Sequence, residues 1–184
     1  YFDSDCSMYT GWLTWNDDKT RSYFDSETGI AASGWINDGS KRYYINPSTH
    51  RSVRWGLTLD GKQYYFNEDC TMHTGWLTWS DDGSRSYFGS DGVALTGWNT
   101  VEGKRYYFDP NNRNHGALWG RTIDGNFYYF DSDCSMYTGW LTWNDDGSIS
   151  YFGDDGAALK GEHIIDGVKY IFDSNYRLKG FEIS

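Results

Sequence analysis

The sequence predicts an all-β fold, a β-hairpin solenoid with about three hairpins per superhelical turn and a superperiod of 64 residues. The first observation is that GWLTWNDD at Gly11 returns as GWLTWSDD at Gly75 and as GWLTWNDD at Gly139. The offsets 75 − 11 and 139 − 75 are both 64 residues. The second is that strand-like runs alternate with turn residues, and the third is that aromatic residues make up 20% of the chain. A fixed period of this length is typical of a solenoid.

Each period divides into three shorter units. A unit consists of an apolar or aromatic strand, a turn, a second strand that ends in YYF or SYF, and a polar connector, which is the pattern of a β-hairpin. We expect a single repeat module, the C-terminal fragment of a larger protein, because the chain opens in mid-unit. Its predicted parts are a partial hairpin at 1–10, full units at 11–33, 34–55, 56–74, 75–96, 97–119, 120–138, 139–160 and 161–179, and a terminal cap at 180–184.

The turns favour the hairpin interpretation. An acidic residue followed by Gly separates two strand-like runs at five places: Asp38-Gly39, Asp60-Gly61, Glu102-Gly103, Asp124-Gly125 and Asp166-Gly167. Such dipeptides suit a two-residue type I′ turn, which needs positive φ at both central residues. The GWLTW units carry a longer link, NDDGS at 144–148, and we expect a wider loop there.

Composition narrows the classes of partner. The net charge is −10, with 26 acidic and 16 basic residues, so we expect no nucleic-acid partner. No apolar run approaches the roughly 18 residues that a membrane-spanning helix needs, so we expect no membrane insertion.

The three cysteines, Cys6, Cys70 and Cys134, occupy the same place in successive periods. Three hairpins advance roughly 29 Å at two strand spacings each. A disulfide needs Cα atoms within about 7 Å of each other. The sequence therefore predicts three reduced, buried thiols.

No set of residues predicts an enzyme, a metal site or a cofactor. The Asp pairs at 17–18, 81–82 and 145–146 lie in hairpin links, where Asp is an ordinary turn residue. We interpret the four His residues, His50, His73, His115 and His163, as surface residues. Trp55 and Trp119, at unit ends, are expected to be structural spacers.

The unit pattern, G-W followed by Y-Y-F-D and a small-residue connector, resembles the cell-wall-binding repeats of Gram-positive surface proteins and phage lysins. It is also similar to the glucan-binding repeats of glucansucrases and to the receptor-binding region of large clostridial toxins. The resemblance covers essentially all full units. It implies a non-catalytic hairpin solenoid on an exported protein, beside an upstream catalytic or adhesin domain.

In the choline-binding branch, the resemblance implies a cage made of the Trp after the unit's Gly, a Trp just before the Tyr pair, and a Tyr of the next hairpin. The second element is missing here. Its position holds Arg21, Arg42, Gln63, Arg85, Arg105, Phe127, Ile149 and Lys169. A quaternary ammonium needs ring faces around it, and an Arg would repel it.

We therefore expect a cell-wall polysaccharide or another glycan, held at several weak aromatic grooves at once, with Arg bonding the sugar hydroxyls. The predicted ligand-binding residues are Trp12, Tyr23, Trp35, Tyr44, Trp76, Tyr87, Trp98, Tyr107, Trp140, Tyr151, Arg21, Arg85 and Arg105. The alternatives are a protein-contact or spacer solenoid, such as toxin-type host-receptor binding, and choline binding on teichoic acids.

Overall fold

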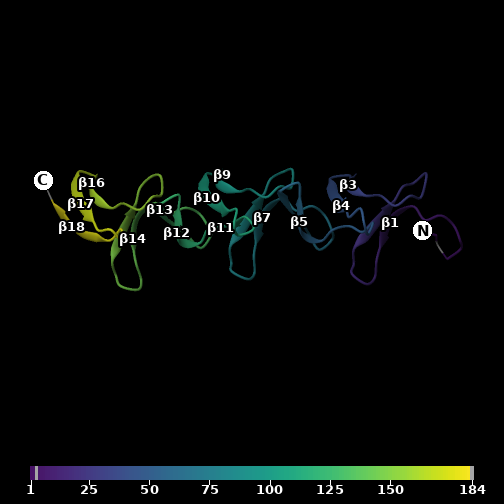
Figure 1. Cartoon of the computed structure of the whole chain (residues 1–184), viewed down its shortest axis with the longest axis horizontal. Coiled ribbons are helices and arrows are strands. Elements are labelled where there is room, and N and C mark those ends of the chain that lie inside the picture. The colour runs from purple at the N-terminus through teal and green to yellow at the C-terminus, as the bar shows by residue number, and fades with distance from the viewer. Residues whose placement is uncertain (3, 183–184) are drawn as a thin grey trace. The chain divides into compact units, whose positions relative to one another are not determined.

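The computed structural model describes residues 1–2 and 4–182, and every regular element in that part of the chain is a β-strand (Figure 1). The strands pair in sequence as antiparallel hairpins, so the predicted all-β hairpin fold is confirmed. The hairpins are β1 (Gly11–Thr14) with β2 (Arg21–Phe24), β3 (Gly34–Asp38) with β4 (Lys41–Ile45), β5 (Trp55–Leu59) with β6 (Lys62–Phe66), β7 (Gly75–Thr78) with β8 (Arg85–Phe88), β9 (Gly97–Val101) with β10 (Lys104–Asp109), β12 (Trp119–Ile123) with β13 (Asn126–Phe130), β14 (Gly139–Thr142) with β15 (Ile149–Phe152), and β16 (Gly161–Ile165) with β17 (Val168–Phe172). Two further strands, β11 (His115–Gly116) and β18 (Leu178–Glu182), add a third strand to the sheets of β10 and β17.

The chain forms two compact units. The first contains Tyr1–Leu77 and Tyr87–Ala94, and the second contains Thr78–Ser86 and Leu95–Ser184. The division passes through the hairpin β7–β8, so each unit has its own run of consecutive hairpins.

Within a unit, the connector that follows one hairpin bonds to the second strand of the hairpin before. In the first unit, the backbone amide of Ser52 donates to the carbonyl of Arg21, and that of Met72 donates to the carbonyl of Arg42. In the second unit, the amide of Met136 donates to the carbonyl of Arg105 at 2.7 Å. These bonds satisfy one edge of each short sheet, and they stack hairpins that would be marginal alone.

The core of each unit contains one side chain from the final aromatic or aliphatic position of each hairpin's second strand. These residues are between 0% and 6% exposed: Phe24, Ile45, Phe66, Phe88, Phe108, Phe130, Phe152 and Phe172. Most of them pair across the hairpin with a Gly in the left-handed region, for example Gly11 with Phe24 at a φ of 84°. The missing Cβ makes that backbone conformation inexpensive at the strand's first residue.

Four of the five predicted type I′ turns are confirmed, because both central residues have positive φ at Asp60-Gly61, Glu102-Gly103, Asp124-Gly125 and Asp166-Gly167. The fifth prediction is wrong. Asp38 pairs with Lys41, so the loop is Gly39-Ser40, and only Gly39 has positive φ, at 59°. Gly at the first central position is the requirement of a type II′ turn, which explains the one-residue shift.

All three cysteines are free, but only Cys70 and Cys134 are buried. The prediction of burial is wrong for Cys6, which is exposed. The Sγ atom of Cys70 lies 3.9 Å from the carbonyl oxygen of Lys19, in the loop of an earlier hairpin. No loop covers Cys6 in the same way in the described chain. Burial raises the pKa of the Cys134 thiol, as expected for a packing residue.

The C-terminal strand differs from the predicted cap. Strand β18 begins at Leu178 and pairs with β17, so regular structure crosses the expected start of the cap at 180. The last two residues of that cap, 183–184, lie outside the described residues.

Candidate functional site

The Trp after each unit's Gly lies directly beside a Tyr of the same hairpin's second strand. In β1–β2, for example, Trp12 and Tyr23 are partners in the register. The ring centroids are 5.1 Å apart for Trp12 and Tyr23, 5.2 Å for Trp35 and Tyr44, 5.0 Å for Trp76 and Tyr87, 5.2 Å for Trp98 and Tyr107, and 4.8 Å for Trp140 and Tyr151. The structure thus brings together the two rings expected in every groove.

A third ring comes from the next hairpin, as the resemblance to choline-binding repeats implied, although the individual residues were not predicted. It is the first aromatic residue of that hairpin's Tyr pair or of its Tyr-Ile equivalent. Its centroid lies 4.6 Å from Trp12 for Tyr43, 5.1 Å from Trp35 for Tyr64, 4.9 Å from Trp98 for Tyr128, and 4.8 Å from Trp140 for Tyr170. The available signal was the alternation of strand side chains, which sends the two residues of a Tyr pair to opposite faces.

An arginine of the chain covers the Trp face in three grooves. The guanidinium carbon lies 4.3 Å from the ring centroid for Arg21 over Trp12, 4.1 Å for Arg42 over Trp35, and 4.6 Å for Arg105 over Trp98. This is the position in which a cation is attracted by the ring quadrupole. Each of the Arg21 and Arg105 guanidinium groups is stacked on its own Trp, so this stacking competes with the hydrogen bonds to sugar hydroxyls that we expected. Arg85 begins strand β8 at the corresponding position.

Trp140 is the exception. The position that holds Arg in the three covered grooves is Ile149 here, and no cation is stacked on Trp140 among the described residues. The Trp140 side is also more open, since this residue is 38% exposed while the other four Trp residues after a unit Gly are half-buried. Trp140, Tyr151 and Tyr170 form the groove with an uncovered Trp face.

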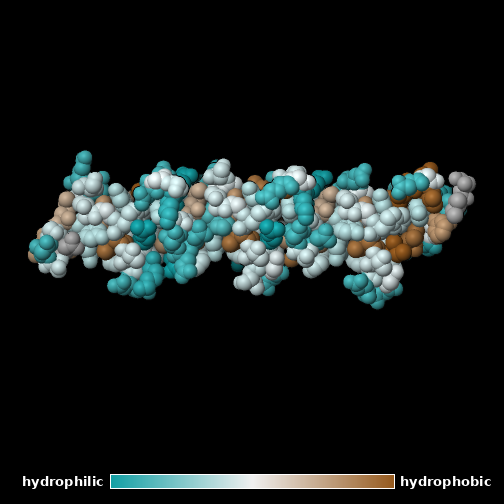
Figure 2. Space-filling model, turned by 180° about the vertical axis from the view of Figure 1, so that it is seen from behind, coloured by the Kyte–Doolittle hydropathy of each residue, from teal (hydrophilic) through white to brown (hydrophobic). Residues whose placement is uncertain are grey.

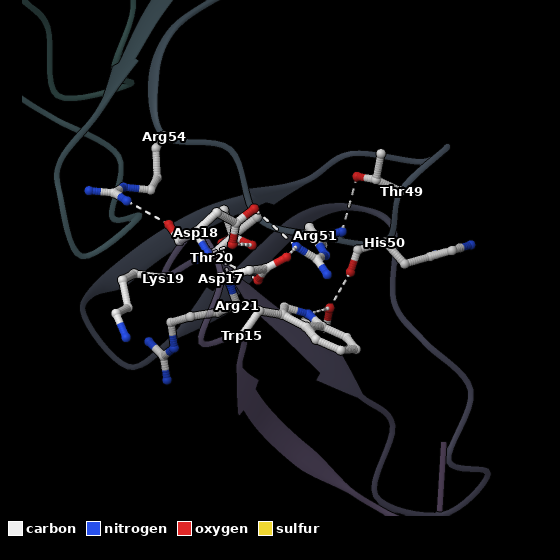
Figure 3. A network of polar contacts seen from close by, with 12 residues as sticks. Trp15, Asp17, Asp18, Lys19, Thr20, Arg21, Thr49, His50, Arg51 and Arg54 are labelled. Atoms are coloured by element: carbon white, nitrogen blue, oxygen red, sulfur yellow. Dashed lines mark hydrogen bonds and ion pairs between the residues drawn. The ribbon is translucent and has the colours of Figure 1, made fainter.

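The second Trp of GWLTW serves a structural network (Figure 3). The indole N–H of Trp15 donates to the hydroxyl oxygen of Ser22 at 2.8 Å, and the Arg51 guanidinium lies 4.4 Å from the Trp15 ring centroid. Arg51 also donates to Asp17 at 2.9 Å and to Asp18 at 3.0 Å. The hydrogen bond from Arg51 lowers the pKa of Asp17. The Asp pair thus positions the guanidinium that stacks on the Trp ring.

A planar side chain also stacks on the corresponding Trp residues of the second unit. Arg177 lies 4.0 Å from the ring centroid of Trp143, and His115 is stacked on Trp79 at 4.5 Å with an interplanar angle of 12°. His115 is only 4% exposed, so its prediction as a surface residue is wrong. The physical reason is its place in the repeat: 115 − 51 is 64, so this planar side chain replaces Arg51. Its Nδ1 atom lies 3.0 Å from the hydroxyl oxygen of Ser84 and 3.5 Å from a carboxylate oxygen of Asp82.

Trp55 and Trp119 differ from the structural spacers that we expected. They are 49% and 51% exposed, and both have positive φ, at 66° and 59°. Each pairs with a buried Phe at the strand position that Gly holds in the other hairpins, because the order is Trp-Gly here instead of Gly-Trp. A non-Gly residue in the left-handed backbone conformation costs roughly 1 kcal/mol. Because the two Trp rings are half exposed, burial of the ring does not offset this cost.

Much of the visible surface is hydrophilic or neutral in hydropathy, and the hydrophobic areas are small and separate (Figure 2). No three His, Cys, Asp or Glu side chains within residues 1–2 and 4–182 converge as a metal ion requires. In the same part of the chain, no helix has the length and apolar character to cross a membrane.

Comparison with known protein families gives two matches. A family described as choline-binding repeat matches residues 57–94, 79–115 and 120–158, which together cover more than half of the chain. A second, described as putative cell wall binding repeat, matches residues 33–48.

Two curated proteins are similar in sequence. The chain is 30% identical to glucosyltransferase-S of Streptococcus mutans over 124 residues, which is 55% of this chain and 8% of that protein. It is 34% identical to toxin A of Clostridium novyi over 96 residues, which is 47% of this chain and 4% of the toxin. The chain therefore corresponds to a small part of each relative.

Solved structures from Streptococcus pneumoniae have the same fold. CbpJ superimposes with a TM-score of 0.80 at 28% identity, covering 97% of this chain and 61% of CbpJ. Choline-binding protein F, solved in the presence of a peptidoglycan analogue, superimposes with a TM-score of 0.79 at 26% identity, covering 98% of this chain and 61% of that protein.

Proposed function

The chain belongs to the choline-binding repeat family, and from this premise we propose that it is a non-catalytic module that binds cell-wall polysaccharide and anchors a larger secreted protein. The observation that carries the proposal is the groove of three aromatic rings, which recurs in both units. Ring faces stack on the apolar faces of sugars, and polar groups beside them bond hydroxyls.

The proposed mechanism is avidity. Each groove offers a small contact, so each site alone is weak. Linked sites raise the effective concentration of the next segment of a polymer, so the bound polymer dissociates far more slowly than a single sugar. The similarity to part of a glucosyltransferase and to a protein solved with a peptidoglycan analogue supports a glycan as the polymer.

A second candidate is choline binding on teichoic acids at the Trp140 groove. Ile149 leaves the Trp140 face free of the guanidinium that covers Trp12, Trp35 and Trp98. A quaternary ammonium could be enclosed there by Trp140, Tyr151 and Tyr170. Among the residues that the structure describes, no Arg stands beside Trp140 to repel a quaternary ammonium, and repulsion by such an Arg was the reason for expecting no choline binding.

The test is co-sedimentation of the chain with purified Gram-positive cell walls, alone, with excess choline, and with soluble α-glucan. We expect binding that glucan releases. Release by choline alone assigns the function to the second candidate. Failure to sediment with the walls contradicts anchoring, and a protein-contact or spacer solenoid then accounts for the chain.

A matched pair of variants assigns the binding to ring faces. Ile149→Arg introduces the side chain that covers the other Trp rings, so it should fold and lose binding at Trp140. Arg21→Ile makes the reverse change and should open Trp12, raising the affinity. If both variants bind as the unchanged chain does, the grooves are not the binding sites.

A further inference from the structure

Each unit contains a surface pocket that the aromatic grooves do not explain. The volumes are about 490 Å³ in the first unit and about 470 Å³ in the second. Both pockets lie between the strand that begins with Lys-Arg and the connector of the next hairpin. The shared lining is Lys41, Arg42, Thr71 and Met72 in the first unit and Lys104, Arg105, Ser135 and Met136 in the second.

The first pocket is positively charged, although the chain carries a net charge of −10. Lys41 and Arg42 line it, and no acidic residue does. The Lys41 ammonium lies 3.3 Å from a carboxylate oxygen of Asp69, with both side chains more than half exposed. An exposed pair of this kind contributes little stability, so the ammonium can turn to a ligand at small cost.

Arg42 has no acidic partner among the described residues. Its guanidinium lies over the Trp35 ring at 4.1 Å, and its buried Nε atom makes no hydrogen bond. Stacking on the ring fixes the orientation of the guanidinium, and Arg42 is one of the residues that line the pocket. A preorganised guanidinium beside a mobile ammonium is the arrangement that recognises the oxygens of a phosphate or a carboxylate.

We propose that these pockets bind an oxyanion, a phosphate or a carboxylate, carried by the cell-wall polymer. The inference rests on the proposed glycan-binding function and adds the charge class of the polymer. Thr71 and Ser135 also line the pockets, but their hydroxyls donate to Asp69 and Asp133, so the donors left for the anion are the Lys and Arg side chains. Met72 or Met136 supplies an apolar surface beside the anion.

The two pockets differ in a way that predicts different affinities. Asp131 lines the second pocket, and the residue 64 positions earlier in the first unit is Asn67. Burial, and then the neighbouring Asp133, raise the pKa of Asp131. A carboxylate in the lining repels an incoming anion, so the first pocket should bind the oxyanion more tightly.

The experiment measures binding of the whole chain to choline-free poly(glycerol phosphate), with polygalacturonate as the carboxylate polymer and dextran as the neutral one. The variant Lys41→Met should lower the affinity for the anionic polymers about three- to tenfold at low salt, because it removes one charge-assisted contact. Asp131→Asn should raise that affinity. The control is Lys62→Met, because Lys62 begins strand β6 as Lys41 begins β4, carries the same charge, and lines neither pocket.

The proposal predicts that the affinity for dextran is equal in all these proteins. A preference for poly(glycerol phosphate) or for polygalacturonate identifies the oxyanion. If Lys41→Met and Lys62→Met lowered the affinity for the anionic polymers equally, the overall charge of the chain would explain the effect and the pocket assignment would be overturned. Failure of both anionic polymers to bind would overturn it as well. Dextran and wall binding that survive such a result would leave the proposed function standing, so the two failures can be told apart.

Discussion

At the scale of single residues, what lies over a Trp ring decides what that ring can do. Trp12, Trp35 and Trp98 carry an arginine, Trp15 carries Arg51, and Trp140 carries no cation among the described residues. Covered rings stabilise the stack of hairpins, since the cation and the ring are held together away from much of the solvent. An uncovered Trp offers its ring face to a ligand, whereas a covered groove offers its Tyr rings together with the guanidinium.

The first prediction compares a packed Trp with an exposed one. Trp98 packs against the buried cluster of Ala117, Ile123 and Phe130, so Trp98→Ala should lower the free energy of unfolding by about 2 to 4 kcal/mol. Trp119 is half exposed, so Trp119→Ala should lower the free energy of unfolding by less than about 1 kcal/mol. Urea unfolding followed by circular dichroism measures both. An equal loss in the two variants would contradict the distinction between covered and open rings.

The second prediction concerns the buried serine beneath the second Trp of GWLTW. Ser150 is 0% exposed, accepts the indole N–H of Trp143 at 2.9 Å, and donates to the carbonyl of Tyr176 at 2.6 Å. Arg177 also donates to this hydroxyl, so Ser150→Ala leaves three half-buried polar groups without this partner, and we expect a loss of about 1 to 3 kcal/mol in thermal or urea unfolding. The exposed Ser174 is the control, and Ser174→Ala should change stability by less than about 0.5 kcal/mol.

The sequence predicted the ring pairs but not the cations that cover them. A Trp and a Tyr at fixed distances from a turn must face each other, so Trp12 and Tyr23 could be paired from the register alone. The stacking of Arg21 on Trp12 depends on the rotamer of a long side chain, which no period encodes. His115 was missed because its role follows from alignment with Arg51 and not from its own residue type.

At the scale of elements, hairpins and their connectors depend on turn geometry and on ion pairs between neighbours. Three Asp-Gly dipeptides and one Glu-Gly dipeptide predicted their turns correctly, because only a few residues accept positive φ at both central positions. The fifth was misplaced because the residues Asp38, Gly39 and Ser40 fit either of two registers. The prediction for Trp55 and Trp119 failed because these hairpins begin with Trp-Gly, whereas the other hairpins begin with Gly.

The third prediction tests the corrected turn. Gly39 is the first central residue of its turn and has a φ of 59°. Gly39→Ala places a Cβ in the left-handed region and should lower the free energy of unfolding by about 1 to 2 kcal/mol in urea. Ser40→Ala should be close to neutral, because Ser40 has no positive φ. A larger loss in Ser40→Ala than in Gly39→Ala would contradict the assignment.

The fourth prediction concerns the ion pair between Lys104 and Asp133, whose charged atoms are 2.8 Å apart. Burial alone would raise the pKa of Asp133, but hydrogen bonds from Lys104 and Ser135 outweigh it and hold the pKa at about 2. This is below the ordinary value of about 4. The stabilisation is therefore present above pH 4 and is lost as the pH falls from about 4 to about 2.

Lys104→Met removes the pair, so the variant should be less stable than the unchanged chain at pH 6. The difference should be small, because both side chains are more than a third exposed and the solvent screens them. Urea unfolding at pH 6, 4 and 2 should give a difference that shrinks toward zero. A difference that grows as the pH falls would have the wrong sign for a carboxyl with a lowered pKa.

At the scale of the whole molecule, repetition is the property that serves the proposed function. The 64-residue period places an aromatic groove and a Lys-Arg pocket in both units. Repeated weak sites suit a repetitive polymer, since release requires all contacts to open together. The period was visible in the sequence, but which copy of a groove is open was not, because that depends on single exchanges such as Ile149 in place of Arg.

Open Trp faces are expected to bind a cell-wall glycan. Sedimentation with purified Gram-positive cell walls would compare the unchanged chain with Ile149→Arg and Arg21→Ile under the same conditions. Binding should be weaker when Trp140 is covered and stronger when Trp12 is opened. Undiminished binding by Ile149→Arg, together with no gain in Arg21→Ile, would contradict the claim.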